Sequence, residues 1–222
     1  MSIFENVGKI KKDIAQACEK INRDPQSLTI VGVTKYVNSQ IAKELYDQGI
    51  THLGENRADV FLEKHAEITE NVTWHFIGTL QTRKVRDIIN KIDYLHSLDR
   101  LSLAEEIQKR ATGKVKCFVQ VNVVDEQSKH GLTLGAVISF ITQLAAYDKI
   151  EVVGLMTMAP ATTDELVIRD CFSRLRGLQQ KVLKLQLNHA PCAELSMGMT
   201  DDFKIAIDEG ATFVRLGRCL VE

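Results

Sequence analysis

The sequence predicts an α/β protein that folds as a (β/α)8 TIM barrel. Eight short apolar runs alternate with amphipathic segments along the 222 residues. A parallel connection between strands needs a long crossover, so this alternation indicates a parallel sheet. An open, doubly wound sheet is the alternative, but its glycine fingerprint G-x-G-x-x-G is absent. Eight strand–helix units without a two-strand hairpin therefore favour the closed barrel.

The chain is expected to begin with an additional helix over about residues 3–21. Its apolar residues recur at spacings of three and four, and Ser2 with Glu5 forms a capping box. The apolar stripe covers fewer than three heptads, so we expect this helix to pack on the barrel rather than form a coiled coil. The barrel then occupies about 28–222. No linker or low-complexity tract divides the chain, which indicates one domain over 1–222.

The remaining elements follow in order from the apolar patterns and the turn residues between them. Strands are expected at 28–35, 52–55, 73–78, 94–98, 116–123, 151–158, 194–197 and 213–217. Helices are expected at 39–48, 57–68, 81–91, 100–111, 133–146, 164–187 and 201–209.

Composition argues against several classes of protein. The 28 basic and 29 acidic side chains nearly cancel, with no basic cluster that would suggest nucleic-acid binding. No apolar stretch is long enough to span a bilayer, and no signal peptide is visible. The five cysteines are odd in number and lack a C-x-x-C spacing, which fits a reducing compartment. We expect a cytoplasmic protein, most simply a monomer.

Chemistry in a barrel sits where the strands end, and Lys35 closes the first strand run. A desolvated amine loses its proton more readily, and a neutral amine attacks an aldehyde to form a Schiff base. Taken alone, a strand-end lysine that reaches into water is the simpler interpretation.

The last two strands end in residues suited to a phosphate group. Barrels often hold phosphate there, through backbone N–H groups and a helix N-terminus. Gly198 and Gly217 allow close approach of an anion, while Ser196 and Thr200 offer hydroxyl donors. Each residue alone is explained by a tight turn or a helix cap, but together they predict a phosphate site.

Strand eight pairs with strand one in a closed barrel, so Lys35 and this phosphate site should be neighbours. A phosphorylated aldehyde such as pyridoxal phosphate would engage both. Arg215 lies two residues before Gly217 and so points to the same side of its strand. An arginine that donates to the pyridine nitrogen keeps it unprotonated and weakens the ring as an electron sink. A salt bridge to a neighbouring strand is the alternative for Arg215.

A series of short blocks runs in a characteristic order along nearly the whole chain. The blocks are Gly32–Lys35, Gly54–Asn56, Trp74–Gly78 with Leu80, Gln81 and Lys84, His96–Asp99, Gln120–Asn122, Lys129–Gly131, Gly154–Met156, Leu195–Asp202 and Val214–Gly217. In this order they resemble the pyridoxal-phosphate homeostasis protein family, whose barrel is that of the N-terminal domain of alanine racemases (fold type III of pyridoxal-phosphate proteins).

The resemblance implies a covalent aldimine between Lys35 and pyridoxal 5'-phosphate. It also implies that Arg215 faces the pyridine nitrogen and that Asn56 and His75 line the ring pocket. The phosphate would be held by Ser196, Thr200, Gly217 and the backbone near Arg218. The resemblance further implies a protein that buffers the cofactor or delivers it to apoenzymes, and that influences amino- and keto-acid balance without robust catalysis.

Two departures from the family pattern concern the phosphate. Thr200 stands where serine is expected, which keeps the hydroxyl. The family typically ends in a segment that contains a small hydroxyl residue. In this chain, Arg218 and the residues after it stand in that place. The phosphate would therefore gain a guanidinium, or rely on the Arg218 backbone N–H.

Two other functions remain open from the sequence. A racemase or lyase of low activity is one, although barrel racemases carry a second β-rich domain that supplies a catalytic tyrosine, and this chain leaves no residues for it. A metal-dependent enzyme is the other. Its candidate ligands are Glu55, His75, His96 and Asp99, which lack the paired H-x-H that makes metal binding specific. Hydrogen bonds at the barrel mouth are the simpler role for them.

Overall fold

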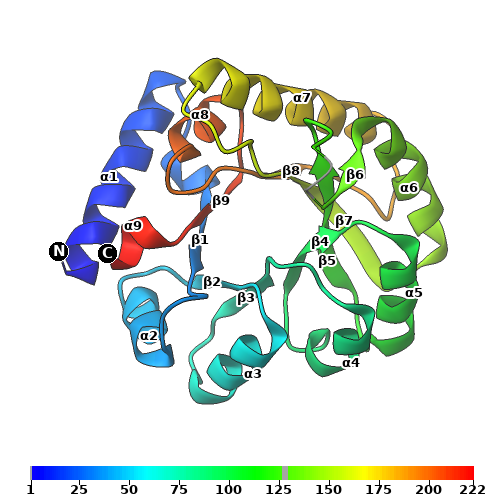
Figure 1. Ribbon diagram of the computed structural model, residues 1–222, viewed down its shortest axis with the longest axis horizontal. Helices are drawn as coiled ribbons and strands as arrows, with labels where there is room; N and C mark the ends of the chain where they lie inside the picture. The colour runs from blue at the N-terminus through cyan, green and yellow to red at the C-terminus, as the bar shows by residue number, and fades with distance from the viewer. Residues whose placement is uncertain (1, 127–129) are drawn as a thin grey trace.

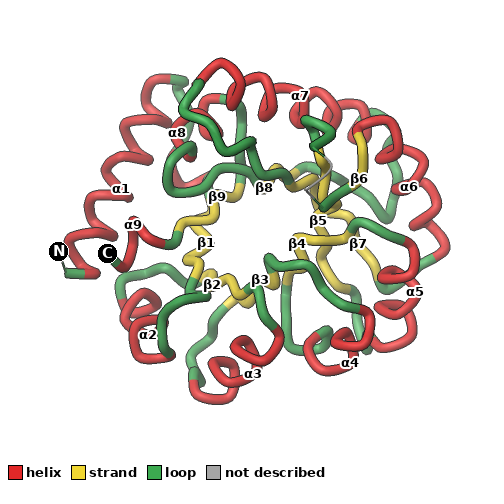
Figure 2. Tube along the Cα trace, in the orientation of Figure 1, coloured by secondary structure: helices red, strands yellow, loops and turns green. Residues whose placement is uncertain are grey.

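A computed structural model describes residues 2–126 and 130–222 and confirms the predicted barrel. Eight parallel strands form a closed ring in the order β1-β2-β3-β4-β5-β7-β8-β9, with β9 pairing back to β1 (Figure 1). The helices form an outer layer around the strands (Figure 2). The barrel strands are β1 Thr29–Val33, β2 His52–Glu55, β3 Thr73–Phe76, β4 Tyr94–Leu98, β5 Val115–Asn122, β7 Ile150–Met156, β8 Glu194–Ser196 and β9 Phe213–Leu216.

The helices cover the strands because each presents an apolar face to the barrel. The α-helices are α1 Ile3–Lys20, α2 Ser39–Asp47, α3 Ala58–Glu67, α4 Val85–Ile88, α5 Leu101–Arg110, α6 Val137–Gln143, α7 Glu165–Leu183, α8 Phe203–Asp208 and α9 Arg218–Val221. Short 3-10 turns at Pro25–Ser27, Thr82–Lys84, Leu134–Ala136 and Leu144–Ala146 complete the connections.

Helix α1 is the predicted extra helix, and it packs against α8 and α9 beside the barrel (Figure 1). Its capping box is present, with the Glu5 N–H donating to Ser2 Oγ at 3.2 Å and the Ser2 N–H donating to Glu5 Oε2 at 2.8 Å. The buried Asn6 amide donates to the Leu220 carbonyl at 3.4 Å. The two ends of the chain therefore lie side by side. No helix within the described residues is long and apolar enough to cross a membrane.

The structure differs from several of the predicted boundaries. The predicted helix 133–146 begins instead with a two-residue strand, β6 Leu132–Thr133, which pairs with the end of β5. The α9 helix lies beyond the last predicted strand. Strand β1 ends at Val33, so Lys35 is not its last residue: the Thr34 N–H still bonds to Gly54, but the Val37 N–H then closes a turn onto the Thr34 carbonyl.

Candidate functional site

The loops that follow β8 and β9 meet at the carboxyl end of the barrel. The Arg215 N–H donates to the Gly198 carbonyl at 2.9 Å, and Thr200 Oγ1 donates to Cys219 Sγ at 3.5 Å. Gly198 has a φ of +93°, and a Cβ there would lie 2.6 Å from the Ala206 Cβ. Only glycine suits this position, both for its backbone conformation and for its close approach to α8.

Gly217 and Arg218 lie beside the first strand, as the closed barrel requires. A Cβ on Gly217 would lie 3.4 Å from the Val33 carbonyl oxygen. Helix α9 begins at Arg218, and the first N–H groups of a helix have no partner within it and favour an anion. The exposed Arg218 guanidinium donates to Asp201 at 3.0 Å. The residues predicted to bind phosphate from β8 and β9 thus come together here.

Lys35 lies in the β1–α2 turn, two residues beyond Val33, at the same end of the barrel as Gly217. Its side chain is partly exposed, and Nζ lies 4.7 Å from the ring centroid of Tyr36. Lys35 therefore lies at the end of the barrel where the loops expected to hold a phosphate meet.

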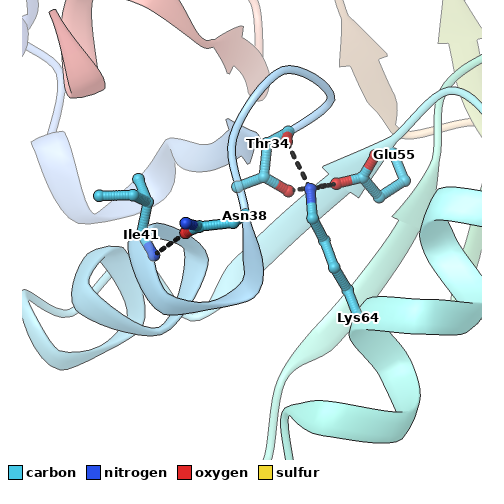
Figure 3. A network of polar contacts seen from close by, with 5 residues as sticks. All are labelled: Thr34, Asn38, Ile41, Glu55 and Lys64. Atoms are coloured by element: carbon cyan, nitrogen blue, oxygen red, sulfur yellow. Dashed lines mark hydrogen bonds and ion pairs between the residues drawn. The ribbon is translucent and has the colours of Figure 1, made fainter.

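A buried network supports the residue that precedes Lys35 (Figure 3). Lys64 Nζ donates to Glu55 Oε1 at 2.6 Å and to the Thr34 carbonyl at 2.5 Å, and Thr34 Oγ1 donates to the same Glu55 oxygen at 2.5 Å. Lys64 is only 3% exposed, and Glu55 and Thr34 are fully buried. Among the described residues, Glu55 Oε2 has no hydrogen-bond partner. The network fixes the start of the turn that carries Lys35.

Arg215 projects into the barrel interior from β9, with only 5% of its surface exposed. Its Nη1 donates to Ser196 Oγ at 2.7 Å, and its Nη2 donates to the Thr157 carbonyl at 2.9 Å. Burial lowers the pKa of Arg215 to about 10, and the nearby Asp202 carboxylate acts in the opposite direction. The guanidinium therefore stays charged at neutral pH and is held by two acceptors.

Ser196 connects this arginine to three histidines, His52, His75 and His96, which we call the histidine column. Ser196 Oγ lies 2.9 Å from His96 Nδ1, His96 Nε2 lies 2.8 Å from His75 Nδ1, and His75 Nε2 lies 2.9 Å from His52 Nδ1. Desolvation holds the pKa values of His75 and His96 well below the ordinary value, and it also lowers the pKa of His52. The column is therefore neutral at pH 7.

The structure separates the two residues expected to line the ring pocket. Asn56 follows β2 and lines a pocket of about 360 Å³ with Phe76, Thr79 and Gln81. His75 instead lies inside the barrel with no exposed surface and with both ring nitrogens bonded to other histidines. Its position indicates a role within the column.

The residues considered as metal ligands are engaged in other contacts. Glu55 bonds to Lys64, His96 belongs to the column, and Asp99 pairs with Arg100 at 2.7 Å. Within residues 2–126 and 130–222, no group of three or more His, Cys, Asp or Glu side chains is arranged to hold a metal ion. Lys129, part of one family-like block, lies outside the described residues.

Sequence reasoning missed Lys64 and His52. Lys64 lies on an amphipathic helix, where a lysine normally faces water, so its own pattern gives no signal. His52 could have been found, because it opens its strand at a position whose side chain alternates to the same face as Gly54.

The buried histidines predict that the fold loses stability in acid. In the unfolded chain they take up protons below about pH 6.5, whereas His75 and His96 stay neutral in the folded barrel because their pKa values are lowered. The unfolded state then binds more protons, so stability is complete above about pH 6.5 and falls as the pH drops towards the folded-state pKa values. Each of the two contributes a loss of about 1.4 kcal/mol per pH unit in this range. Urea unfolding at several pH values measures the slope, and a constant free energy of unfolding between about pH 7 and 5 would contradict the prediction.

The chain matches the alanine racemase N-terminal domain family over residues 7–221. It is 36% identical to a protein of Aquifex aeolicus named pyridoxal phosphate homeostasis protein, over 99% of this chain and 97% of that one. The chain belongs to the pyridoxal phosphate homeostasis protein family.

Solved structures support this family membership. PipY of Synechococcus elongatus, in a structure with pyridoxal phosphate bound, is 27% identical, with a TM-score of 0.86 over the full length of both chains. The alanine racemase of Clostridium difficile, at 18% identity, shares the fold alone, with a TM-score of 0.78 over 97% of this chain and 56% of the racemase. The homeostasis-protein barrel is therefore also that of the racemase N-terminal domain.

Proposed function

We propose that the protein binds pyridoxal 5'-phosphate and acts in its intracellular homeostasis, as a buffer or delivery protein in the cytoplasm. The observation that carries the proposal is that Lys35 lies in the turn after β1, at the barrel end where the β8 and β9 loops meet, with the buried Arg215 on the adjoining strand β9. The name of the Aquifex aeolicus relative and the pyridoxal phosphate bound to PipY support it.

The donor set fits the chemistry of this cofactor. Lys35 would hold the aldehyde through a Schiff base, as the amine is partly exposed and lies at the barrel mouth. Thr200 would reach the phosphate with its hydroxyl, whose contact in this structure is the weak acceptor Cys219 Sγ at 3.5 Å. Gly217 would let the phosphate approach the backbone, and Arg218 would offer its N–H at the start of α9. Ser196 is assigned to Arg215, because its buried hydroxyl already contacts both Arg215 Nη1 and His96 Nδ1, at 2.7 and 2.9 Å.

Arg215 argues for binding rather than turnover. Bound pyridoxal phosphate supplies an electron sink, and that sink is strongest when the pyridine nitrogen is protonated. A charged arginine only donates hydrogen bonds, so Arg215 favours an unprotonated nitrogen. We therefore propose a carrier without robust catalysis. We further propose that it is a monomer, that it passes the cofactor to apoenzymes, and that Asn56 lies near the bound ring. A racemase or lyase of low activity is the alternative.

An absorption spectrum tests the proposal. Purified protein incubated with pyridoxal phosphate is expected to show a visible band that borohydride reduction removes, because reduction saturates the C=N bond. A protein that stays colourless and gains no mass after reduction would reject cofactor binding. Racemisation assays with several amino acids separate the alternatives: turnover at rates typical of enzymes, about 1 per second or more, would favour the racemase.

A further inference from the structure

The histidine column connects Arg215 to the opposite end of the barrel by regular steps. His52 opens β2 and pairs with Thr73, two residues before His75. Tyr94 pairs with His75 and lies two residues before His96. Each step therefore climbs two residues towards the carboxyl ends of the strands. From β4 the last step crosses the barrel interior to β8, which is not a neighbour of β4 in the sheet.

The hydrogen bonds from Arg215 through Ser196 to the histidine column all donate in one direction. An arginine can only donate, so Ser196 Oγ must accept from Arg215. The serine hydrogen is then available to His96 Nδ1. A neutral His96 that accepts at Nδ1 carries its proton on Nε2 and donates to His75 Nδ1. By the same logic His75 donates from Nε2 to His52.

The reverse direction would be costly. His96 would donate to Ser196 Oγ, which would then accept from both sides. Its own hydrogen would have no acceptor among the described residues, in a fully buried position. A buried donor without a partner costs about 1–3 kcal/mol. The forward direction satisfies every polar atom between Arg215 and His52.

Aromatic packing keeps the rings in place. His75 stacks on Tyr94 with centroids 4.6 Å apart and planes 2° apart, and His96 lies 4.4 Å from Phe118. Phe213 also lies near both imidazoles, with ring centroids 6.0 Å from His75 and 6.4 Å from His96. The rings therefore have little freedom to turn away from one another.

We propose that His52, His75 and His96 are positioning residues for Arg215, locked in one shared tautomer with the proton on Nε2. The series of hydrogen bonds that fixes the tautomer starts at Arg215, passes through Ser196 and ends at the half-buried His52. It holds the guanidinium in the orientation that faces the cofactor ring. The purpose of the array rests on the proposed function, whereas its hydrogen-bond direction does not.

The tautomers are measured without any cofactor. Nitrogen-15 NMR of the histidine-labelled protein at neutral pH distinguishes a protonated ring nitrogen from an unprotonated one. For all three rings we expect an unprotonated Nδ1 and a protonated Nε2. A proton on Nδ1 of His75 or His96, or a positively charged ring, would overturn the proposal.

Replacement of the end residue tests transmission along the column. His52→Phe removes the acceptor of His75 at the least buried position, so we expect mixed tautomers at His75 and altered nitrogen shifts at His96. The matched control is His65→Phe, which changes a histidine that contacts Trp74 outside the column and should leave the His96 signals unchanged. Unchanged His96 signals in folded His52→Phe would show that the column transmits nothing.

Binding of pyridoxal phosphate tests the purpose. Ser196→Ala removes the link between Arg215 and the column, and we expect about five-fold weaker binding, the equivalent of one hydrogen bond. Ser196→Thr keeps the hydroxyl and should restore part of the affinity. Normal affinity in Ser196→Ala would overturn this inference and leave the proposed function intact. A wild-type protein that fails to bind would reject the proposed function, while the tautomers would still be decided by NMR.

Discussion

Replacing Lys35 with alanine is expected to abolish the borohydride-fixed adduct with pyridoxal phosphate. The turn that carries Lys35 follows Val33, which contacts Gly217, at the same end of the barrel as the start of α9. We therefore expect the Lys35 amine to be the one that reacts with the aldehyde while the phosphate is held there. Mass spectrometry after reduction measures the adduct and identifies the modified peptide. In the wild-type protein it should be the peptide that contains Lys35.

Two control variants separate covalent attachment from charge. Lys35→Arg keeps a positive charge at the mouth but cannot form the Schiff base, so it should retain weak, non-covalent binding without an adduct. Lys116→Ala removes a lysine from the start of β5, at the other end of the barrel, and should react as the wild type does. An adduct that persists in Lys35→Ala would disprove the assignment of this residue.

Most of the fold could be predicted because its signals are local. The barrel strands follow short apolar runs and the helices carry apolar stripes, and both patterns can be read within a short window. The errors have two causes. Strand β6 exists only because it pairs with Val121 and Asn122 of β5, a contact between strands that the local pattern does not show. Strand β1 ends early because a local turn, in which the Val37 N–H donates to the Thr34 carbonyl, interrupts the apolar run.

The candidate site was predictable to the extent that strand ends define it. Thr200, Gly217 and Arg218 meet because β8 and β9 are neighbours, which the closed barrel already required. What each side chain does there depends on its partners. Ser196 has the hydroxyl expected for a phosphate, but Arg215 and His96 occupy it. A sequence gives the donors at a site, whereas only the packing shows which of them are already used.

Replacing Lys64 with methionine is expected to destabilise the protein strongly. The change keeps most of the apolar stem but removes the ammonium group from a fully buried Glu55. Breaking a buried ion pair from one side typically costs about 3–5 kcal/mol, because the remaining group stays buried without its partner. Here the loss also releases the Thr34 carbonyl, one residue before Lys35. Urea unfolding at neutral pH measures the change in the free energy of unfolding.

Two further variants test whether burial of the ion pair causes the loss of stability in Lys64→Met. Lys204→Met removes an ammonium group from an exposed ion pair with Asp13 and should cost less than about 1 kcal/mol. The double variant Lys64→Met with Glu55→Leu removes both charges and should recover much of the stability, since an apolar pair in place of a buried ion pair is often neutral. A Lys64→Met protein as stable as Lys204→Met would contradict the buried network. The double variant also separates stability from positioning. If it is as stable as the wild type but binds pyridoxal phosphate poorly, the lost binding cannot be due to lost stability. The main effect of the network would then be to position the turn that carries Lys35.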